Sequence, residues 1–271
     1  MVSDGEHGEV WRKTRAGVPA EYFTAEAAGL RWLAVADGAP VPCVREVTTE
    51  SICVDRVPDN SPTVAAAARF GADLARTHRA GAKTFGAPPP HAPGSGWIAD
   101  LPMAYGDYGS FGPMYAQLRV APYLSLAVAR GHLDAADCAV FDELNDRLSR
   151  DDPTVCGPPA RPARLHGDLW TGNLLWAPDG SGELRGWLID PAAHGGHPET
   201  DLAMLALFDA PHLDQILAGY QSVTPLAPGW RARVALHQVY PLLVHAVLFG
   251  GGYGDSAVQA ARRALRACGP R

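Results

Sequence analysis

One segment in the second half of the chain constrains its fold more than any other. Residues 163–190 contain two apolar stretches typical of β-strands, separated by a Pro-Asp-Gly-Ser-Gly run at residues 178–182. A turn at this run folds the second stretch back on the first. The second stretch ends at Asp190, so we expect this carboxylate to be exposed at a strand end and to lie close to Asn173.

The loop before this hairpin has a pattern typical of phosphoryl transfer. In the run His-Gly-Asp-Leu-Trp-Thr-Gly-Asn at residues 166–173, Asp168 and Asn173 are five residues apart. Phosphoryl transfer needs a carboxylate that accepts or orients the proton of the attacking hydroxyl, and an amide oxygen that holds a metal ion on the phosphates. We expect Asp168 to act on the acceptor, and Asn173 and Asp190 to bind Mg²⁺ as hard oxygen ligands. Side chains that only stabilise turns are the alternative interpretation.

The first part of the chain predicts a small antiparallel lobe. Short strands are expected at residues 9–13, 43–47 and 51–57, and one amphipathic helix at residues 22–36. Pro58, Ser61 and Pro62 then interrupt the pattern, and Ser61 with Pro62 suits the cap and first turn of a helix that ends at Gly81. We therefore expect a first lobe at residues 1–58 and a second at 59–271.

The second lobe is expected to be mostly helical, which makes the fold class α+β. The segment from Gly81 to Gly112 is rich in Pro and Gly and predicts an ordered surface excursion. Helices are expected at residues 113–130, 134–150, 200–209, 212–222, 230–249 and 255–267. The longest apolar run, residues 240–250, is far shorter than the ~20 residues of a membrane span, so it indicates a buried helix and no membrane association.

Composition excludes several classes of function. The formal net charge is -6, so the protein lacks the excess of positive charge that binds the phosphate backbone of a nucleic acid, and we expect no nucleic-acid partner. The five cysteines are odd in number and scattered, with no pair spaced for zinc or for a disulfide framework. The acidic, polar first residues lack the pattern of a secretory signal. These features favour a cytoplasmic protein, and they leave the oligomeric state open.

Several single residues have two interpretations. His194, His197 and Asp201 suggest a zinc site, but their spacing favours hydrogen-bonded structural roles, with Asp201 as an N-cap or as support for the catalytic loop. Lys13 is either a phosphate-binding lysine or a solvated lysine on an edge strand.

Two further residues depend on their neighbours. Glu26 lies on the edge of an apolar helical stripe, where it either pairs with Lys13 or extends into solvent. Trp170 is either a core residue or part of the acceptor site.

The runs HGDLWTGN and LIDPAAHGGHPETDLAML resemble those of fructosamine kinases, which belong to the wider aminoglycoside-phosphotransferase and protein-kinase-like fold. The resemblance implies a two-lobed fold with a reduced antiparallel N-terminal lobe and ATP bound between the lobes. It implies that Lys13 contacts the phosphates of ATP and that Glu26 orients Lys13. It also implies that the backbone near Asp55 and Val57 binds adenine.

The resemblance also implies an acceptor. This is the 3-hydroxyl of a ketoamine, such as a fructosamine or ribulosamine, whose phosphorylation promotes deglycation of proteins. Trp170 then borders the sugar, while His166, His197 and Asp201 support the loop.

One departure from the family pattern leaves alternatives open. The pattern places a hairpin with a glycine-rich phosphate loop ahead of Lys13, and only twelve residues precede it. Either the start codon is misassigned or nucleotide binding is weakened. The rival functions are a kinase of the same fold that acts on an aminoglycoside, choline or homoserine, and a catalytically weak nucleotide-binding protein.

Overall fold

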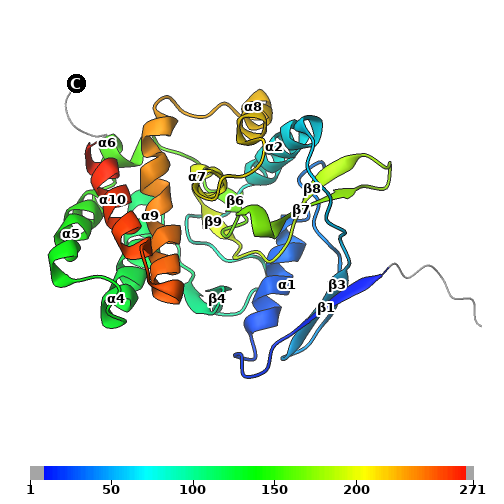
Figure 1. Ribbon diagram of the computed structural model, residues 1–271, viewed down its shortest axis with the longest axis horizontal. Coiled ribbons are helices and arrows are strands. Elements are labelled where there is room, and N and C mark those ends of the chain that lie inside the picture. Colours follow the sequence, from blue (N-terminus) through cyan, green and yellow to red (C-terminus); the bar gives the residue numbers. More distant parts are fainter. Residues whose placement is uncertain (1–8, 267–271) are drawn as a thin grey trace, which may run out of the picture.

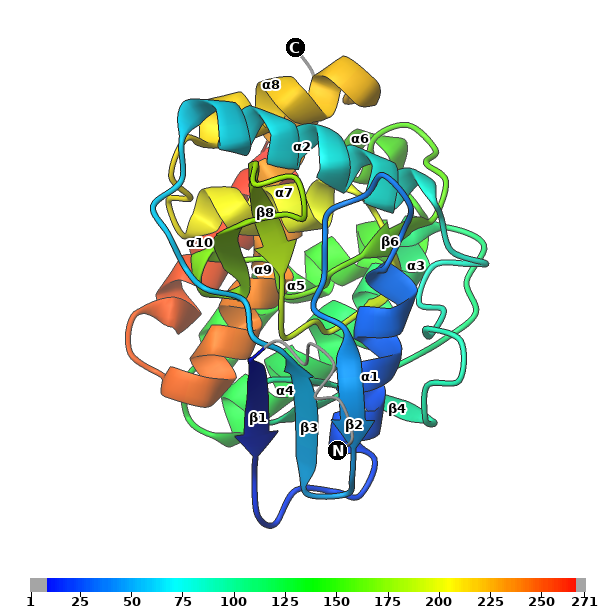
Figure 2. The ribbon, with the colours of Figure 1, turned by 90° about the vertical axis from the view of Figure 1, so that its right-hand side faces the viewer.

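The computed structural model describes residues 9–266, which form a small sheet-containing lobe and a larger helical lobe (Figure 1). Strands β1 (Val10–Thr14), β2 (Val44–Val47) and β3 (Ser51–Asp55) form an antiparallel sheet in the order β1-β3-β2. Helix α1 (Tyr22–Leu33) lies beside this sheet (Figure 2) and contributes buried apolar side chains to a core that includes Ile52. The expected small antiparallel lobe is confirmed.

Helix α1 ends three residues before the expected end at residue 36. The backbone leaves the helical conformation at Ala34 (ψ 77°), and Asp37 adopts a positive φ of 60°. Ala34 still donates its amide to Leu30, which closes the last turn. The turn directs the chain toward Pro40, a residue that cannot donate a backbone hydrogen bond.

Helix α2 (Val64–Arg79) opens the larger lobe and packs against α8 (Leu213–Val223). Two glycines allow the close approach, because a Cβ at Gly71 would lie 1.9 Å from the carbonyl oxygen of Ile216, and one at Gly219 would lie 1.8 Å from that of Ala68. The expected cap was wrong: Thr63, not Ser61, is the N-cap, and its side chain accepts a hydrogen bond from the amide of Ala66.

The Gly81–Gly112 segment contains a hairpin that the sequence analysis did not predict. Strands β4 (Ser95–Ile98) and β5 (Leu101–Ala104) pair antiparallel around a turn at Ala99, whose φ is 47°. The hairpin packs against α1 of the first lobe, where Tyr22 donates its hydroxyl hydrogen to the carbonyl of Ala99 (3.2 Å). The segment therefore joins the lobes as well as covering the surface.

The remaining helices build the core of the larger lobe. Helix α9 (Trp230–Phe249) lies among the others (Figure 1) and buries Val239, Leu243 and Val247. By length and composition alone this helix could cross a membrane, but 61% of its apolar 18-residue stretch is buried inside the fold. The others are α3 (Phe111–Met114), a π-helical turn η1 (Tyr115–Val120), α4 (Ala121–Ala129), α5 (Ala135–Ser149), α6 (Pro153–Cys156), α7 (Glu199–Leu207) and α10 (Tyr253–Arg266).

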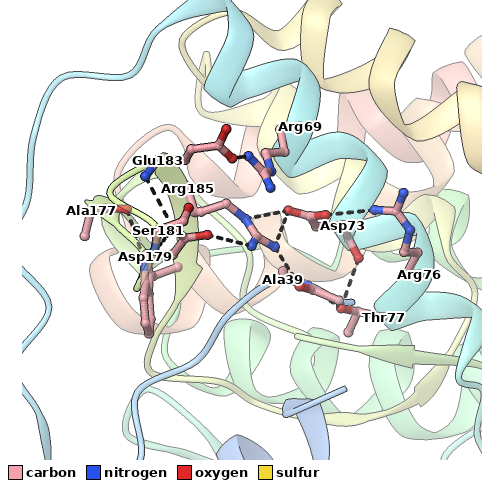
Figure 3. A network of polar contacts seen from close by, with 12 residues as sticks. Ala39, Arg69, Asp73, Arg76, Thr77, Ala177, Asp179, Ser181, Glu183 and Arg185 are labelled. Atoms are coloured by element: carbon pink, nitrogen blue, oxygen red, sulfur yellow. Dashed lines mark hydrogen bonds and ion pairs between the residues drawn. The ribbon is translucent and has the colours of Figure 1, made fainter. Parts of the chain in front are cut away.

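The larger lobe also contains two short strand pairs that carry the loop and the segment ending at Asp190. Strand β6 (Ala163–Leu165) pairs with β9 (His194–Gly196), and β7 (Leu174–Pro178) pairs with β8 (Leu184–Leu188) as the expected hairpin. Arg185 of β8 binds Asp73 of α2 through two hydrogen bonds (2.7 and 3.0 Å) and also donates to the carbonyl of Gly38 (Figure 3). This network fixes the β7–β8 hairpin to α2.

Candidate active site

A buried carboxylate holds the backbone of the loop between β6 and β7. Asp201 of α7 accepts hydrogen bonds from the amides of His166 (2.8 Å) and Gly167 (2.9 Å). Its Oδ2 also binds Nε2 of the buried His78 (3.1 Å). Helix α7 has Pro198 at its N-cap position, so the N-cap interpretation of Asp201 was wrong. Asp201 is placed to fix the backbone of the loop.

His166 connects this loop to the segment that carries Asp190. Its Nδ1 accepts a hydrogen bond from the amide of Asp168 (3.2 Å), so the proton lies on Nε2, which donates to the carbonyl of Ile189 (2.8 Å). Burial lowers the pKa of His166, which keeps the ring neutral. Gly167 (φ 84°) leaves no room for a side chain, because a Cβ would lie 2.1 Å from the carbonyl oxygen of Ala192.

Asn173 orients the carboxylate of Asp168. The Nδ2 group of Asn173 donates to Oδ2 of Asp168 (3.0 Å) and to its carbonyl oxygen (2.8 Å). Since the amide nitrogen is used in this way, Oδ1 of Asn173 is the atom left to bind a cation. Burial raises the pKa of Asp168 to about 6, and the nearby Asp190 and Asp201 carboxylates act in the same direction.

Lys13 binds two carboxylates from different parts of the chain. Its Nζ lies 3.0 Å from Oε2 of Glu26 on α1 and 3.1 Å from Oδ2 of Asp190. Burial opposes the charge on Lys13, but the two carboxylates outweigh it and raise the lysine pKa. Burial also raises the pKa of Glu26 to about 7, although Lys13 opposes that shift. Lys13 is therefore not a solvated edge-strand lysine, and Glu26 does not extend into solvent.

These side chains line one cavity of about 340 Å³ between the lobes. Lys13 and Glu26 come from the small lobe, Asp168 and Asn173 from the loop, and Asp190 from the end of the β7–β8 hairpin. Asp190 has a φ of 51° and its side chain is 44% exposed. The amide of Ile189, next to it, donates to the carbonyl of Asn173 (3.1 Å). The expected proximity of Asp190 and Asn173 is thus observed.

The aromatic wall of this cavity includes one expected residue and several that the sequence analysis missed. Trp170 lines the cavity and is 40% exposed, so it is not a core residue. Trp97 and Tyr105 enter from the unpredicted β4–β5 region, and His245 and Phe249 from α9. No local sequence signal marks these residues, because they reach the cavity only through tertiary contacts.

Asp55 and Val57 are not among the residues that line the cavity. Asp55 ends β3, where its amide donates to the carbonyl of Cys43 (3.0 Å) and its carboxylate binds Arg45. That amide is therefore already used within the sheet, which argues against its use by a nucleotide.

The histidines considered for zinc have other partners. His194 donates from Nδ1 to the carbonyl of Ala192, and Nδ1 of His197 accepts from the amide of Glu199. His197, Glu199 and His237 bring potential ligand atoms within 4.8 Å of one another. However, Arg233 binds both oxygens of Glu199 (2.9 and 2.5 Å), so its guanidinium already neutralises that carboxylate. The arrangement is typical of a buried ion pair.

Comparisons with known proteins agree with this geometry. A protein from Klebsiella aerogenes named as a probable ketoamine kinase is 38% identical over 153 residues, which are 56% of this chain and 49% of that protein. A second, from Escherichia coli K12 and named likewise, is 32% identical over 90% of this chain and 81% of its own length.

A solved structure from Thermobifida fusca, described as that of a fructosamine-3-kinase, is 44% identical. It superposes with a TM-score of 0.86, over 95% of this chain and 85% of that one. The fold is that of the protein-kinase-like phosphotransferases. The family profile described as fructosamine kinase matches residues 1–267. The chain belongs to the fructosamine kinase family and is an ATP-dependent phosphotransferase that acts on a hydroxyl group.

Proposed function

We propose that this enzyme phosphorylates the 3-hydroxyl of ketoamines of the fructosamine or ribulosamine type, with ATP and Mg²⁺. The observation that carries the proposal is the single cavity in which Lys13, Asp168, Asn173 and Asp190 meet, in a chain of the fructosamine kinase family. We expect the enzyme to act in the cytoplasm. Its acceptor is a small-molecule or a protein-bound ketoamine.

Asp168 is assigned to the acceptor hydroxyl. Its carboxylate is held by Asn173, and its pKa of about 6 lies close to neutral pH, where a general base is most effective. The ionised carboxylate orients the attacking hydroxyl and accepts its proton. The surrounding residues supply positioning and electrostatic stabilisation, which are the main contributions in phosphoryl transfer.

The oxygen donors of the cavity fit Mg²⁺. Oδ1 of Asn173 and the carboxylate of Asp190 are hard oxygen ligands, the kind this ion prefers. When bound, the ion neutralises charge on the phosphates. Lys13, oriented by Glu26, is assigned to the phosphates. For adenine we retain backbone near Val57, whereas the amide of Asp55 is unsuited because Cys43 accepts its hydrogen.

Trp170 is assigned to the sugar of the acceptor. It lies two residues after Asp168 and lines the same cavity, where its indole face can pack on the C–H surface of a sugar. Phosphate is a better leaving group than hydroxide, so elimination of the new phosphate and hydrolysis of the remaining sugar–amine bond would free the amine. That sequence is the proposed route to deglycation.

A panel of acceptors tests the proposal. Purified enzyme with Mg-ATP is assayed against matched fructosamine, ribulosamine, aminoglycoside, choline and homoserine compounds. We expect kcat/KM to be highest for a ketoamine, and Trp170→Ala to weaken ketoamine turnover while leaving the KM for ATP nearly unchanged. Trp187→Ala is the matched control, because Trp187 lies on β8 outside the cavity lining. A preference for any other acceptor in the panel would overturn the assignment.

A further inference from the structure

Arg119 is a buried cation without an opposite charge among residues 9–266. Its side chain is 1% exposed, and its Nη1 donates to the carbonyls of Ala104 (2.9 Å) and Leu118 (3.0 Å). Its Nε and Nη2 atoms are buried and have no hydrogen-bond partner in the part of the chain that the structure describes. The guanidinium also lies over the ring of Tyr240, 5.6 Å from its centroid, which attracts the cation but does not neutralise it.

Two other arginines that are largely removed from water are paired with carboxylates, whereas the partly buried Arg164 donates to backbone carbonyls alone. Arg233, whose side chain is 9% exposed, binds Glu199 through two nitrogens, and Arg185, 15% exposed, binds Asp73 in the same way. A buried charge without a partner carries a large desolvation cost. The contrast indicates that Arg119 has a partner from outside the chain.

Arg119 lines a small cavity. The cavity measures about 10 Å³ and is lined by residues that include Arg119, Tyr240 and His194. The hydroxyl of Tyr240 is buried and makes no hydrogen bond of good geometry among the described residues, although the Tyr123 hydroxyl lies close enough to interact with it. The neighbouring Tyr123 donates its own hydroxyl hydrogen to the carbonyl of Pro102 (2.9 Å). A space of this size holds one water molecule or one ion of similar radius.

We propose that Arg119 and Tyr240 bind a single monovalent anion of halide size, such as chloride. The donors are the Nε–H and Nη2–H groups of Arg119 and the hydroxyl of Tyr240. His194 also lines the cavity and could compete, because it donates from Nδ1 to Ala192 and so keeps a lone pair on Nε2, whereas His197 accepts on Nδ1 and so carries its proton on Nε2. A water bridging Arg119 and His194 is therefore the alternative occupant. The charge of Arg119 favours the anion, because water satisfies an N–H group without neutralising it.

The position of the site connects it to the catalytic loop. Arg119 lies in η1, and π-helical turns are rare and often found at functional sites. The cavity is also lined by Leu165 and His194, which are register partners in the β6–β9 pair, and Leu165 directly precedes His166. A bound anion would offset the charge of Arg119 next to Leu165, the last residue of the strand that precedes the loop.

Bromide replacement tests the proposal on the unmodified protein. Crystals grown in sodium bromide are measured at the bromine absorption edge. We expect an anomalous peak within hydrogen-bond distance of Nε or Nη2 of Arg119. Ordered density there without an anomalous signal, at a bromide concentration that populates surface sites, would identify a water and overturn the proposal.

Thermal unfolding tests the same claim in solution. Gluconate is replaced stepwise by chloride or bromide at constant ionic strength, and we expect a saturable rise in Tm of about 2–4 °C. Tyr240→Phe should weaken the halide dependence, while Tyr108→Phe, which removes a hydroxyl that is bonded to Gln117 outside the cavity lining, should keep it. Arg119→Met should abolish it. A Tm of the wild-type protein that does not depend on halide would refute the site.

Discussion

Two groups of charged side chains lie near opposite ends of strand β8, and they differ in charge balance. The cavity group has three carboxylates and one lysine: Glu26, Asp168, Asp190 and Lys13; the Arg15–Asp100 pair, which also lines the cavity, adds no net charge. The network in Figure 3 has three carboxylates and three arginines: Asp73, Asp179, Glu183, Arg69, Arg76 and Arg185. The first group has an excess of negative charge, whereas the second is neutral.

The difference shows in the pKa values. Burial raises the pKa of Glu26 to about 7 and that of Asp168 to about 6, and nearby carboxylates add to both shifts. In the balanced network burial also raises the pKa of Asp73, but the neighbouring arginines oppose that shift, and hydrogen bonds from Ser181 and then the Arg185 guanidinium lower the pKa of Asp179 to about 2. An excess of buried carboxylate destabilises a fold unless a cation binds there, so the imbalance itself marks the functional site.

The largest expected effect separates the two groups by activity. Asp168→Asn keeps the shape of the side chain but removes its basicity, so we expect kcat to fall about 10²- to 10⁴-fold while nucleotide affinity stays nearly unchanged. Asp179→Asn is the matched control in the balanced network and should leave kcat within about twofold. Steady-state kinetics and calorimetry with ATP make the comparison. An Asp168→Asn variant that keeps more than about a third of wild-type turnover would contradict the assignment.

The second effect separates the two groups by stability. Arg185→Met leaves the buried Asp73 with Arg76 alone, so we expect the free energy of unfolding to fall by on the order of 3 kcal/mol. The KM values of the protein that remains folded should not change, because Arg185 does not line the cavity. Chemical denaturation and steady-state kinetics on the same sample measure both quantities. A selective rise in the KM for ATP would show that the network takes part in binding.

The third effect concerns the metal. Asp190→Asn removes a negative oxygen ligand and one partner of Lys13, so we expect the Mg²⁺ concentration for half-maximal activity to rise at least about tenfold. Asp100→Asn is a suitable control, because Asp100 lines the same cavity and pairs with Arg15 instead. An unchanged Mg²⁺ dependence in Asp190→Asn would remove Asp190 from the metal site.

The smallest effect is a pH dependence. The folded pKa of Asp168 lies above its model-peptide value of 3.8, and the ionised form is the active one, so activity should fall as the pH drops through about 6. Below that point we expect roughly a tenfold loss per pH unit. The residual activity of Asp168→Asn should lack this acid limb. An acid limb that persists in the variant would assign the titration to another group.

Much of the small lobe and of the catalytic loop could be predicted from the sequence, because the signals are local. The strand that contains Lys13, the hairpin that ends at Asp190 and the helix at residues 230–249 follow from alternation, turn residues and helical periodicity. The fold class then followed from the order of these elements and from the resemblance in the catalytic loop.

The aromatic wall of the cavity could not be predicted, because it depends on tertiary contacts. Trp97 enters the cavity only because the β4–β5 hairpin packs on α1, and that hairpin turns at Ala99 without a typical turn pair. Asp55 was placed by resemblance; its amide is bonded to the carbonyl of Cys43, and a role of the nearby backbone in adenine binding stays a prediction. The unpartnered Nε and Nη2 atoms of Arg119 likewise appear only when burial and hydrogen bonds are known.

The most direct test of the central claim is to identify the product of the wild-type enzyme with Mg-ATP and a ribulosamine or fructosamine, by phosphorus NMR and mass spectrometry. We predict a single phosphomonoester on the 3-hydroxyl of the sugar, formed together with an equal amount of ADP, and no product with Asp168→Asn on the same timescale. Phosphate on another hydroxyl, or ADP formed without a phosphorylated ketoamine, would contradict the account.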